Sequence, residues 1–171
     1  MKMPRLTRIV NVLLTAALFT FAAAAQTSEL TLRTGVSPHD GVDNVYRRFS
    51  ESYRTLNVDQ IADQYTQTAA YLAPDAEVLT GRDNIRPGFK RFYDSVKNNG
   101  RTMAISFEIV QRLVDKTMGY DVGIFTLRTF KDGKEINSGQ GKFVVVTVKD
   151  ADGKWLFQVD GYSGLRPGPP K

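Results

Sequence analysis

The sequence predicts an α+β fold in which a cone-shaped, curved antiparallel sheet wraps round three helices. Apolar residues recur at helical spacing in three segments of the first half, at about 42–56, from 57, and at about 82–96. From Met103 onward the pattern changes to the alternation and turns typical of long strands. Helices gathered on one face of a meandering sheet form an α+β domain, and strong bending of the sheet leaves an apolar interior.

The helical segments carry start and stop signals. Asp40 or Asp43 is placed to cap the first helix, and Asn57 with Gln60 three residues later resembles a capping box for the second. The third helix is expected to stop at 98–100, where the sequence reads Asn-Asn-Gly.

The strand segments are predicted from alternation and turn residues. Two short strands, at about 69–72 and 77–80, separate the second and third helices. In the strand at about 103–114, alternation places Ile105, Phe107, Ile109 and Gln111 on one face, and Ser106, Glu108, Val110 and Arg112 on the other.

The strongest strand signal is the hairpin "KFVVVTVKDADGKWLFQVDGYS" at 142–163. Phe143–Val146 are apolar on both faces, which predicts a central strand covered on both sides. In its partner strand, alternation places Trp155, Phe157 and Val159 on one face, and Leu156, Gln158, Asp160 and Tyr162 on the other.

The N-terminus predicts export. Lys2, Arg5 and Arg8 form a basic lead, and an apolar run from Ile9 ends in three alanines. We therefore expect 1–25 to be a cleaved secretory signal peptide and the mature protein to be periplasmic or extracellular. An uncleaved membrane anchor is the competing interpretation, although the run is short for a membrane span.

The rest of the chain is interpreted as a linker at 26–41, one domain at 42–163 and a disordered tail at 164–171. Without the leader, 20 basic residues face 18 acidic ones, and no basic cluster interleaved with aromatic residues is present. We therefore expect no nucleic-acid partner, and no membrane partner after cleavage. The chain has no cysteine, and its only histidine, His39, is expected to be a solvated loop residue.

Four segments carry a resemblance to a known family: "YRRFSESYRTLNVDQIADQY", "YTQTAAYLAP", "GRDNIRPGFKRFY" and "DADGKWLFQVDGYS". In this order the chain at about 42–163 resembles the nuclear transport factor 2-like superfamily, in particular its SnoaL-like branch. The resemblance implies a cone-shaped α-β barrel, an open pocket between helices and sheet, and homodimers through the sheet. It implies no single activity, because members include isomerases, dehydratases, cyclases, transport factors and binding modules.

The catalytic groups of relatives are not matched at the corresponding positions. The three catalytic positions of ketosteroid isomerase fall on Phe49, Ala73 and Val145, which cannot transfer a proton. The two histidines of scytalone dehydratase-like members are impossible with one histidine. The buried Asp-Arg-Asp arrangement of limonene epoxide hydrolase-like members has no clear match either.

Asp160 is the remaining catalytic candidate, because SnoaL-like members often carry an acid after the tryptophan of the last strand. The ligand pocket is predicted to be lined by Tyr46, Phe49, Tyr65, Tyr71, Phe89, Tyr93, Val145, Gln158 and Tyr162. The alternative for Asp160 is a structural carboxylate that bonds backbone amides or pairs with an arginine, such as Arg82, Arg86 or Arg128.

Three functions remain open. The first, which we favour, is an exported module that binds a small apolar or amphipathic molecule, or a partner, without catalysis and without a cofactor or metal. The second is a SnoaL-like isomerase, cyclase or dehydratase that uses Asp160 as general acid or base on an apolar carbonyl compound, with Tyr46 or Tyr162 as the donor. The third is a filled cone with a purely structural role, which a cavity well below about 300 Å³ would support.

Overall fold

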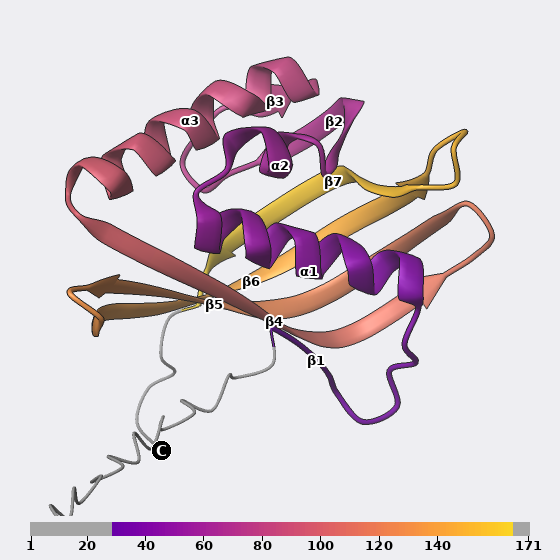
Figure 1. Cartoon of the computed structure of the whole chain (residues 1–171). Helices are drawn as coiled ribbons and strands as arrows, with labels where there is room; N and C mark the ends of the chain where they lie inside the picture. Colours follow the sequence, from indigo (N-terminus) through magenta and orange to yellow (C-terminus); the bar gives the residue numbers. More distant parts are fainter. Residues whose placement is uncertain (1–28, 166–171) are drawn as a thin grey trace, which may run out of the picture.

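The computed structural model describes residues 29–165, so the predicted signal peptide at 1–25 and most of the predicted tail lie outside the described residues. The helices are α1 (Asp40–Thr55), α2 (Val58–Ala62) and α3 (Arg82–Asn98). The strands are β1 (Leu30–Leu32), β2 (Tyr65–Leu72), β3 (Leu79–Thr80), β4 (Arg101–Val114), β5 (Met118–Lys131), β6 (Lys134–Lys149) and β7 (Trp155–Gly164). All three helices lie on one side of the bent sheet (Figure 1). No helix in this described part is long and apolar enough to cross a bilayer.

The seven strands form one sheet in the order β1-β4-β5-β6-β7-β2-β3, which confirms the α+β prediction. The four long strands β4 to β7 pair antiparallel, as expected. Two pairs differ from the expectation, because β1 runs parallel to β4 and β2 runs parallel to β7. Since β1 and β3 are separate edges, the sheet is open and does not close into a barrel.

The segment predicted as a linker contains the edge strand β1. Leu30 pairs with Phe107, and the Arg33 amide donates to the Ile109 carbonyl oxygen at 2.9 Å. A three-residue strand is too short for alternation to reveal it in a sequence.

The cap of α1 also differs from the prediction. His39, not Asp40 or Asp43, is the N-cap: its Nδ1 accepts a hydrogen bond from the Val42 amide at 3.2 Å. The His39 ring packs edge-on against Trp155 at 5.0 Å, so this histidine is a structural residue of the α1 terminus. The predicted Asn57 cap is confirmed, because its Oδ1 accepts from the Gln60 amide at 3.0 Å.

Two bulges change which side chains face the helices. In β4 the register shifts between Ile109 and Gln111, so that Val110 is the extra residue and Arg112 turns inward. In β7, Val159 pairs with Val146 but Phe157 pairs with Thr147, so that Gln158 is the extra residue. A bulge moves every residue beyond it to the other face relative to simple alternation. Arg112 and Phe157 therefore lie on the concave side, where alternation did not place them.

The convex face of the sheet is less covered than predicted. β6 is central, as expected, but Val144 on its outer face is 48 % exposed. The prediction that Phe143–Val146 are covered on both sides is therefore wrong within a single copy of the protein. The helices lie on the concave side only (Figure 1).

Two glycine–phenylalanine pairs connect β5 and β6 on the concave face of the sheet. Gly123 is opposite Phe143, and Phe125 is opposite Gly141. A Cβ atom at Gly141 would overlap the Phe125 ring and lie 2.8 Å from the Ser163 carbonyl oxygen. Each ring thus occupies the space over a glycine of the neighbouring strand, an arrangement that compensates for glycine in a sheet.

We expect the Gly141→Ala variant to lower the free energy of unfolding by about 1–3 kcal/mol, because the added methyl group overpacks this contact. The matched control is Gly139→Ala, two residues earlier in β6, where nothing lies within 4 Å of an added Cβ. Urea unfolding of both variants measures the difference. Equal stability of the two variants would contradict the role assigned to the glycine–phenylalanine pair.

Candidate functional site

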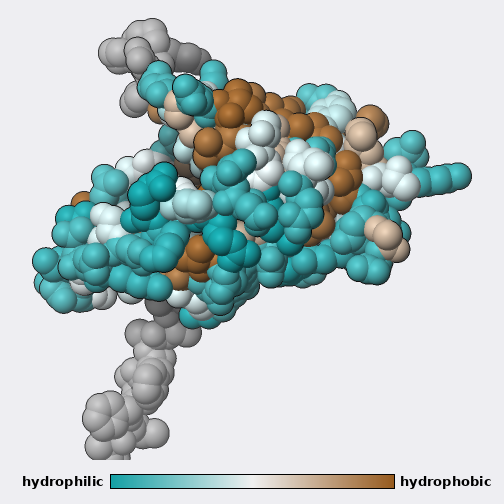
Figure 2. Space-filling view, turned by 90° about the horizontal axis from the view of Figure 1, so that it is seen from above, coloured by the Kyte–Doolittle hydropathy of each residue, from teal (hydrophilic) through white to brown (hydrophobic). Residues whose placement is uncertain are grey.

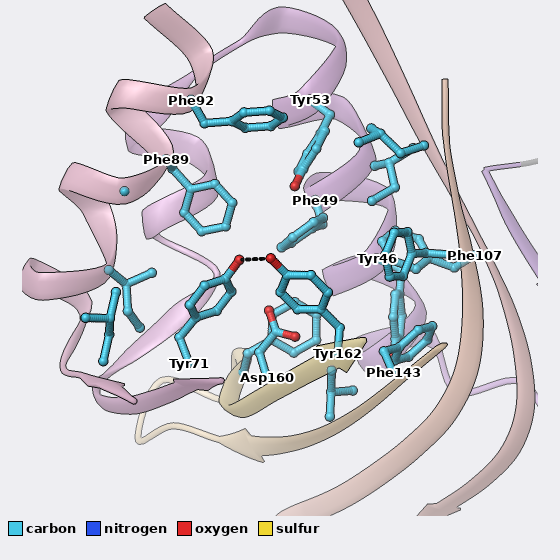
Figure 3. A pocket seen from close by; sticks show the side chains of 18 residues that line it. Tyr46, Phe49, Tyr53, Tyr71, Phe89, Phe92, Phe107, Phe143, Asp160 and Tyr162 are labelled. Carbon is cyan, nitrogen blue, oxygen red and sulfur yellow. Dashed lines mark hydrogen bonds between the residues drawn. The ribbon is translucent and has the colours of Figure 1, made fainter. Parts of the chain in front are cut away.

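A cavity of about 460 Å³ lies between the concave face of the sheet, α1 and α3 (Figure 3). Eleven of its eighteen lining residues are phenylalanine or tyrosine. The lining comprises Tyr46, Phe49, Tyr53, Tyr71, Leu79, Ile85, Gly88, Phe89, Phe92, Ile105, Phe107, Phe125, Leu127, Phe143, Val145, Phe157, Asp160 and Tyr162.

The surface seen from above is largely hydrophilic but carries an apolar patch (Figure 2). In Figure 1 this side holds α3, β2 and β3. The exposed apolar residues of this region include Leu72, Val78 and the cavity-lining Phe92, which is 38 % exposed. Apolar groups thus reach the surface on the side of the molecule where α3 borders the cavity.

Asp160 is the only carboxylate of the cavity lining, and no lysine, arginine or histidine belongs to that lining within residues 29–165. The residue is 8 % exposed, and its Oδ2 accepts a hydrogen bond from the Tyr65 hydroxyl at 2.5 Å. Figure 3 shows the carboxylate close to Tyr71 and Tyr162, whose hydroxyl oxygens are 3.3 Å apart. Asp160 and the hydroxyls of Tyr71 and Tyr162 thus form one polar group at one side of a mainly apolar cavity.

Burial raises the pKa of Asp160 to about 6, because the ionised carboxylate loses its hydration in the cavity. The hydrogen bond from Tyr65 acts in the opposite direction and lowers this pKa. Two arginines considered as partners are bound elsewhere. Arg82 donates to the Tyr65 carbonyl oxygen and lies 3.6 Å from Asp63, and Arg86 pairs with Asp59.

Three of the cavity tyrosines are neutral hydroxyls because of their burial. Burial raises the pKa of Tyr46, Tyr53 and Tyr71, and nearby carboxylates or tyrosines raise it further. The Tyr46 hydroxyl is buried beside Asp121, and this carboxylate raises the pKa of the tyrosine further.

Next to this cavity lies a buried Asp-Arg-Asp cluster, which was not expected from the sequence. The Arg112 guanidinium donates to both carboxylate oxygens of Asp121 at 2.8 Å and also bonds Asp43. All three side chains are at most 5 % exposed. None of them lines the cavity. The cluster ties α1 to β4 and β5, and the bulge at Val110 is what turns Arg112 toward it.

Val145 separates the two acidic groups of the concave face. It pairs with Asp121 of β5 on one side and with Asp160 of β7 on the other. One carboxylate is thus bound by an arginine, and the other faces the cavity.

The family model that describes a SnoaL-like domain matches residues 42–163. The chain belongs to the SnoaL-like domain family. No curated protein matches the sequence.

Solved structures share the fold of this SnoaL-like domain. A protein from Xanthomonas campestris, described as a calcium/calmodulin dependent protein kinase II association domain, is 24 % identical over 77 % of this chain and 91 % of its own, with a TM-score of 0.59. An ntf2-like protein with a cystatin-like fold from Novosphingobium aromaticivorans is 10 % identical over 75 % of this chain and 82 % of its own, with a TM-score of 0.65.

A ketosteroid isomerase-like protein from Erwinia carotovora atroseptica is 13 % identical over 75 % of this chain and 96 % of its own, with a TM-score of 0.57. At these identities the likeness concerns the fold. Together with the family match, it confirms the nuclear transport factor 2-like superfamily and its SnoaL-like branch.

Seven of the residues predicted for the site lie in the cavity lining of the SnoaL-like domain. They are Tyr46, Phe49, Tyr71, Phe89, Val145, Asp160 and Tyr162. Of the positions that correspond to catalytic groups in ketosteroid isomerase, Phe49 and Val145 line the cavity, whereas Ala73 follows the end of β2 and does not.

Three predicted pocket residues lie outside the lining. Tyr65 is fully buried and bonds Asp160 from within β2. Tyr93 is buried with its hydroxyl 3.4 Å from that of Ser52. Gln158 is the bulged residue of β7, and its Oε1 accepts from Thr66 at 2.8 Å, outside the cavity.

Several residues of the cavity lining were not predicted from the sequence. Phe107 and Ile105 were assigned to one face of their strand but not to the pocket, although their alternation signals a buried face. Tyr53 belongs to the apolar stripe of α1 and was equally recognisable. Phe157 carried no such signal, because only the bulge at Gln158 brings it to the side of Asp160.

Proposed function

We propose that this SnoaL-like domain binds a small apolar or amphipathic molecule in its cone-shaped cavity. The observation that carries the proposal is the cavity of about 460 Å³ with an aromatic lining, which its own side chains leave unfilled. Ligand sites typically measure about 300–1,000 Å³ and are mainly apolar with a few convergent polar groups. The filled-cone alternative requires a much smaller volume.

In this proposal Asp160 and the neighbouring hydroxyls of Tyr71 and Tyr162 orient the ligand. They are grouped on β7 and β2, at one side of the apolar cavity, as Figure 3 shows. Burial of the aromatic surface supplies affinity, and the polar group fixes the orientation.

Blocking the cavity tests the proposal. Gly88 of α3 lines the cavity and has nothing within 4 Å of an added Cβ, so a larger side chain fits there without a backbone clash. We expect Gly88→Leu to reduce the affinity for the neutral dye N-phenyl-1-naphthylamine at least about tenfold by occupying the space that the ligand needs. Fluorescence titration measures the change.

Gly88→Ala is the matched control for this variant. Both substitutions remove a helical glycine and are expected to stabilise α3 by up to about 1 kcal/mol, but only leucine fills the cavity. Dye binding that is equal in wild type, Gly88→Ala and Gly88→Leu would contradict binding in this cavity.

A catalytic role of Asp160 is the second candidate, favoured by its pKa of about 6. A group with such a pKa can both release and accept protons near neutral pH. The reaction would be isomerisation, cyclisation or dehydration of an apolar carbonyl compound. Conversion of a β,γ-unsaturated ketone to its conjugated isomer, followed by ultraviolet absorbance, tests it. A rate that is unchanged in Asp160→Asn would reject this role.

We also propose that the mature protein is exported and forms a homodimer through the sheet. The basic and apolar pattern of 1–25 supports export. The exposed Val144 on the convex face supports burial of that face against a second copy of the chain. Native mass spectrometry of protein from the exported fraction measures the cleaved mass, the subunit number and any retained small molecule. A monomer that begins at Met1 would contradict both proposals.

A further inference from the structure

In the part of the chain that the structure describes, the cavity contains an acid without a cationic partner. In the described chain Asp160 has one hydrogen-bond partner, the neutral Tyr65 hydroxyl, on Oδ2. Within residues 29–165, no lysine, arginine or histidine shares the cavity lining. A buried carboxylate normally has a cationic partner, so this one is complementary to a cation that comes from outside the chain.

The walls of the cavity favour the same kind of ligand. Rings dominate the lining, and Tyr71 and Tyr162, with centroids 5.8 Å apart, lie next to Asp160 in Figure 3. The face of an aromatic ring attracts a cation, and the attraction is strongest where water is excluded. An ammonium group placed at Asp160 can also donate to tyrosine hydroxyl oxygens.

We propose that the ligand of this cavity is a hydrophobic amine, whose ammonium group pairs with Asp160 while its apolar body packs against the aromatic walls. This inference rests on the proposed binding function and names its ligand class. It differs from binding of a neutral apolar compound, for which a single unneutralised carboxylate is an obstacle.

Among residues 29–165, the titratable groups that face Asp160 are all tyrosines, and Asp160 is the one carboxylate of the cavity lining. They are Tyr65 and Tyr71 from β2, Tyr46 and Tyr53 from α1, and Tyr162 from β7. Burial raises the pKa of Tyr46, Tyr53, Tyr65 and Tyr71, so these hydroxyls stay neutral through the neutral pH range. No titratable side chain of α3 belongs to the cavity lining.

The test compares 3-phenylpropylamine with its neutral analogue 3-phenylpropan-1-ol by isothermal titration calorimetry on the full mature protein. At about pH 8 the amine is expected to bind at least about tenfold more tightly than the alcohol, because a charge-assisted hydrogen bond replaces a neutral one. The preference should decline toward about pH 5, where Asp160 is protonated and the amine, with a pKa near 10, is still charged.

The Asp160→Asn variant should lose the preference for the amine while retaining the alcohol. Asp75→Asn, the same change at an exposed turn, is the matched control and should behave as wild type. Because the pH dependence is measured on the wild type, the test does not depend on the variant alone.

The outcomes distinguish the proposed ligand class, a hydrophobic amine, from the proposed binding function itself. A stronger affinity for the amine that requires Asp160 supports the inference. Equal affinity for amine and alcohol, or an amine preference that persists in Asp160→Asn, overturns it and leaves the binding function in place. Failure of both compounds and of N-phenyl-1-naphthylamine to bind overturns the binding function as well.

Discussion

Replacing Arg112 with methionine is expected to lower the free energy of unfolding by about 3–5 kcal/mol. The substitution leaves Asp43 and Asp121 buried without the guanidinium that bonds both of them. Desolvation lowers the pKa of Arg112, but its bonds to Asp121 and Asp43 outweigh this and raise it, so the side chain is charged in the folded protein. Urea unfolding near neutral pH measures the loss.

Two comparison variants locate the cause of this loss. Arg33→Met removes another arginine bonded to an acid, but the Arg33–Glu108 pair is exposed, so the expected cost is at most about 1 kcal/mol. The triple variant D43N, R112M, D121N removes all three charges and should recover a large part of the stability. Equal effects of Arg112→Met and Arg33→Met would show that the cluster contributes no more than a surface pair.

The second large effect is expected at Asp160, whose substitution by asparagine should stabilise the protein above about pH 6 by up to about 3 kcal/mol. Burial raises the pKa of this carboxyl in the folded state to about 6, from its ordinary value of about 4 in the unfolded state. The folded protein therefore holds the proton more tightly. The stability that the protonated form provides is present below about pH 4 and is lost as the pH rises through about 6.

The measurement is the difference in unfolding free energy between Asp160→Asn and wild type at several pH values. Taking this difference removes the titration of other groups that both proteins share. Asparagine imitates the neutral carboxyl and can still accept from Tyr65, so the two proteins should be most alike in acid. A difference that is constant from about pH 4 to about pH 8 would contradict the raised pKa of Asp160.

Much of the architecture was predictable because it depends on periodicity that is local in the sequence. The apolar stripes of α1 and α3, the Asn57 cap and the hairpin before Trp155 all depend on residues a few positions apart. The edge strand β1 and the parallel pairing of β2 with β7 depend on partners far away in the chain. No local pattern specifies such partners.

The candidate site was predictable only in part, for a related reason. Residues on regular helices, such as Phe49 and Phe89, could be assigned to the interior from their spacing, whereas Asp160 was assigned to the pocket from the family resemblance. The positions of Phe157 and Arg112 depend on single extra residues in β7 and β4. Whether a strand carries a bulge is decided by its neighbours in the sheet, so alternation alone misplaced both side chains.

Val145 lies between two acids of the concave face that have different partners. Its side chain stands between the carboxylate that Arg112 neutralises and the carboxylate that faces the empty volume. A hydroxyl or amide at this position would offer a hydrogen-bonded route from one acid to the other. Val145 therefore keeps the hydrogen bonds of the Asp43–Arg112–Asp121 cluster apart from the Asp160–Tyr65 hydrogen bond.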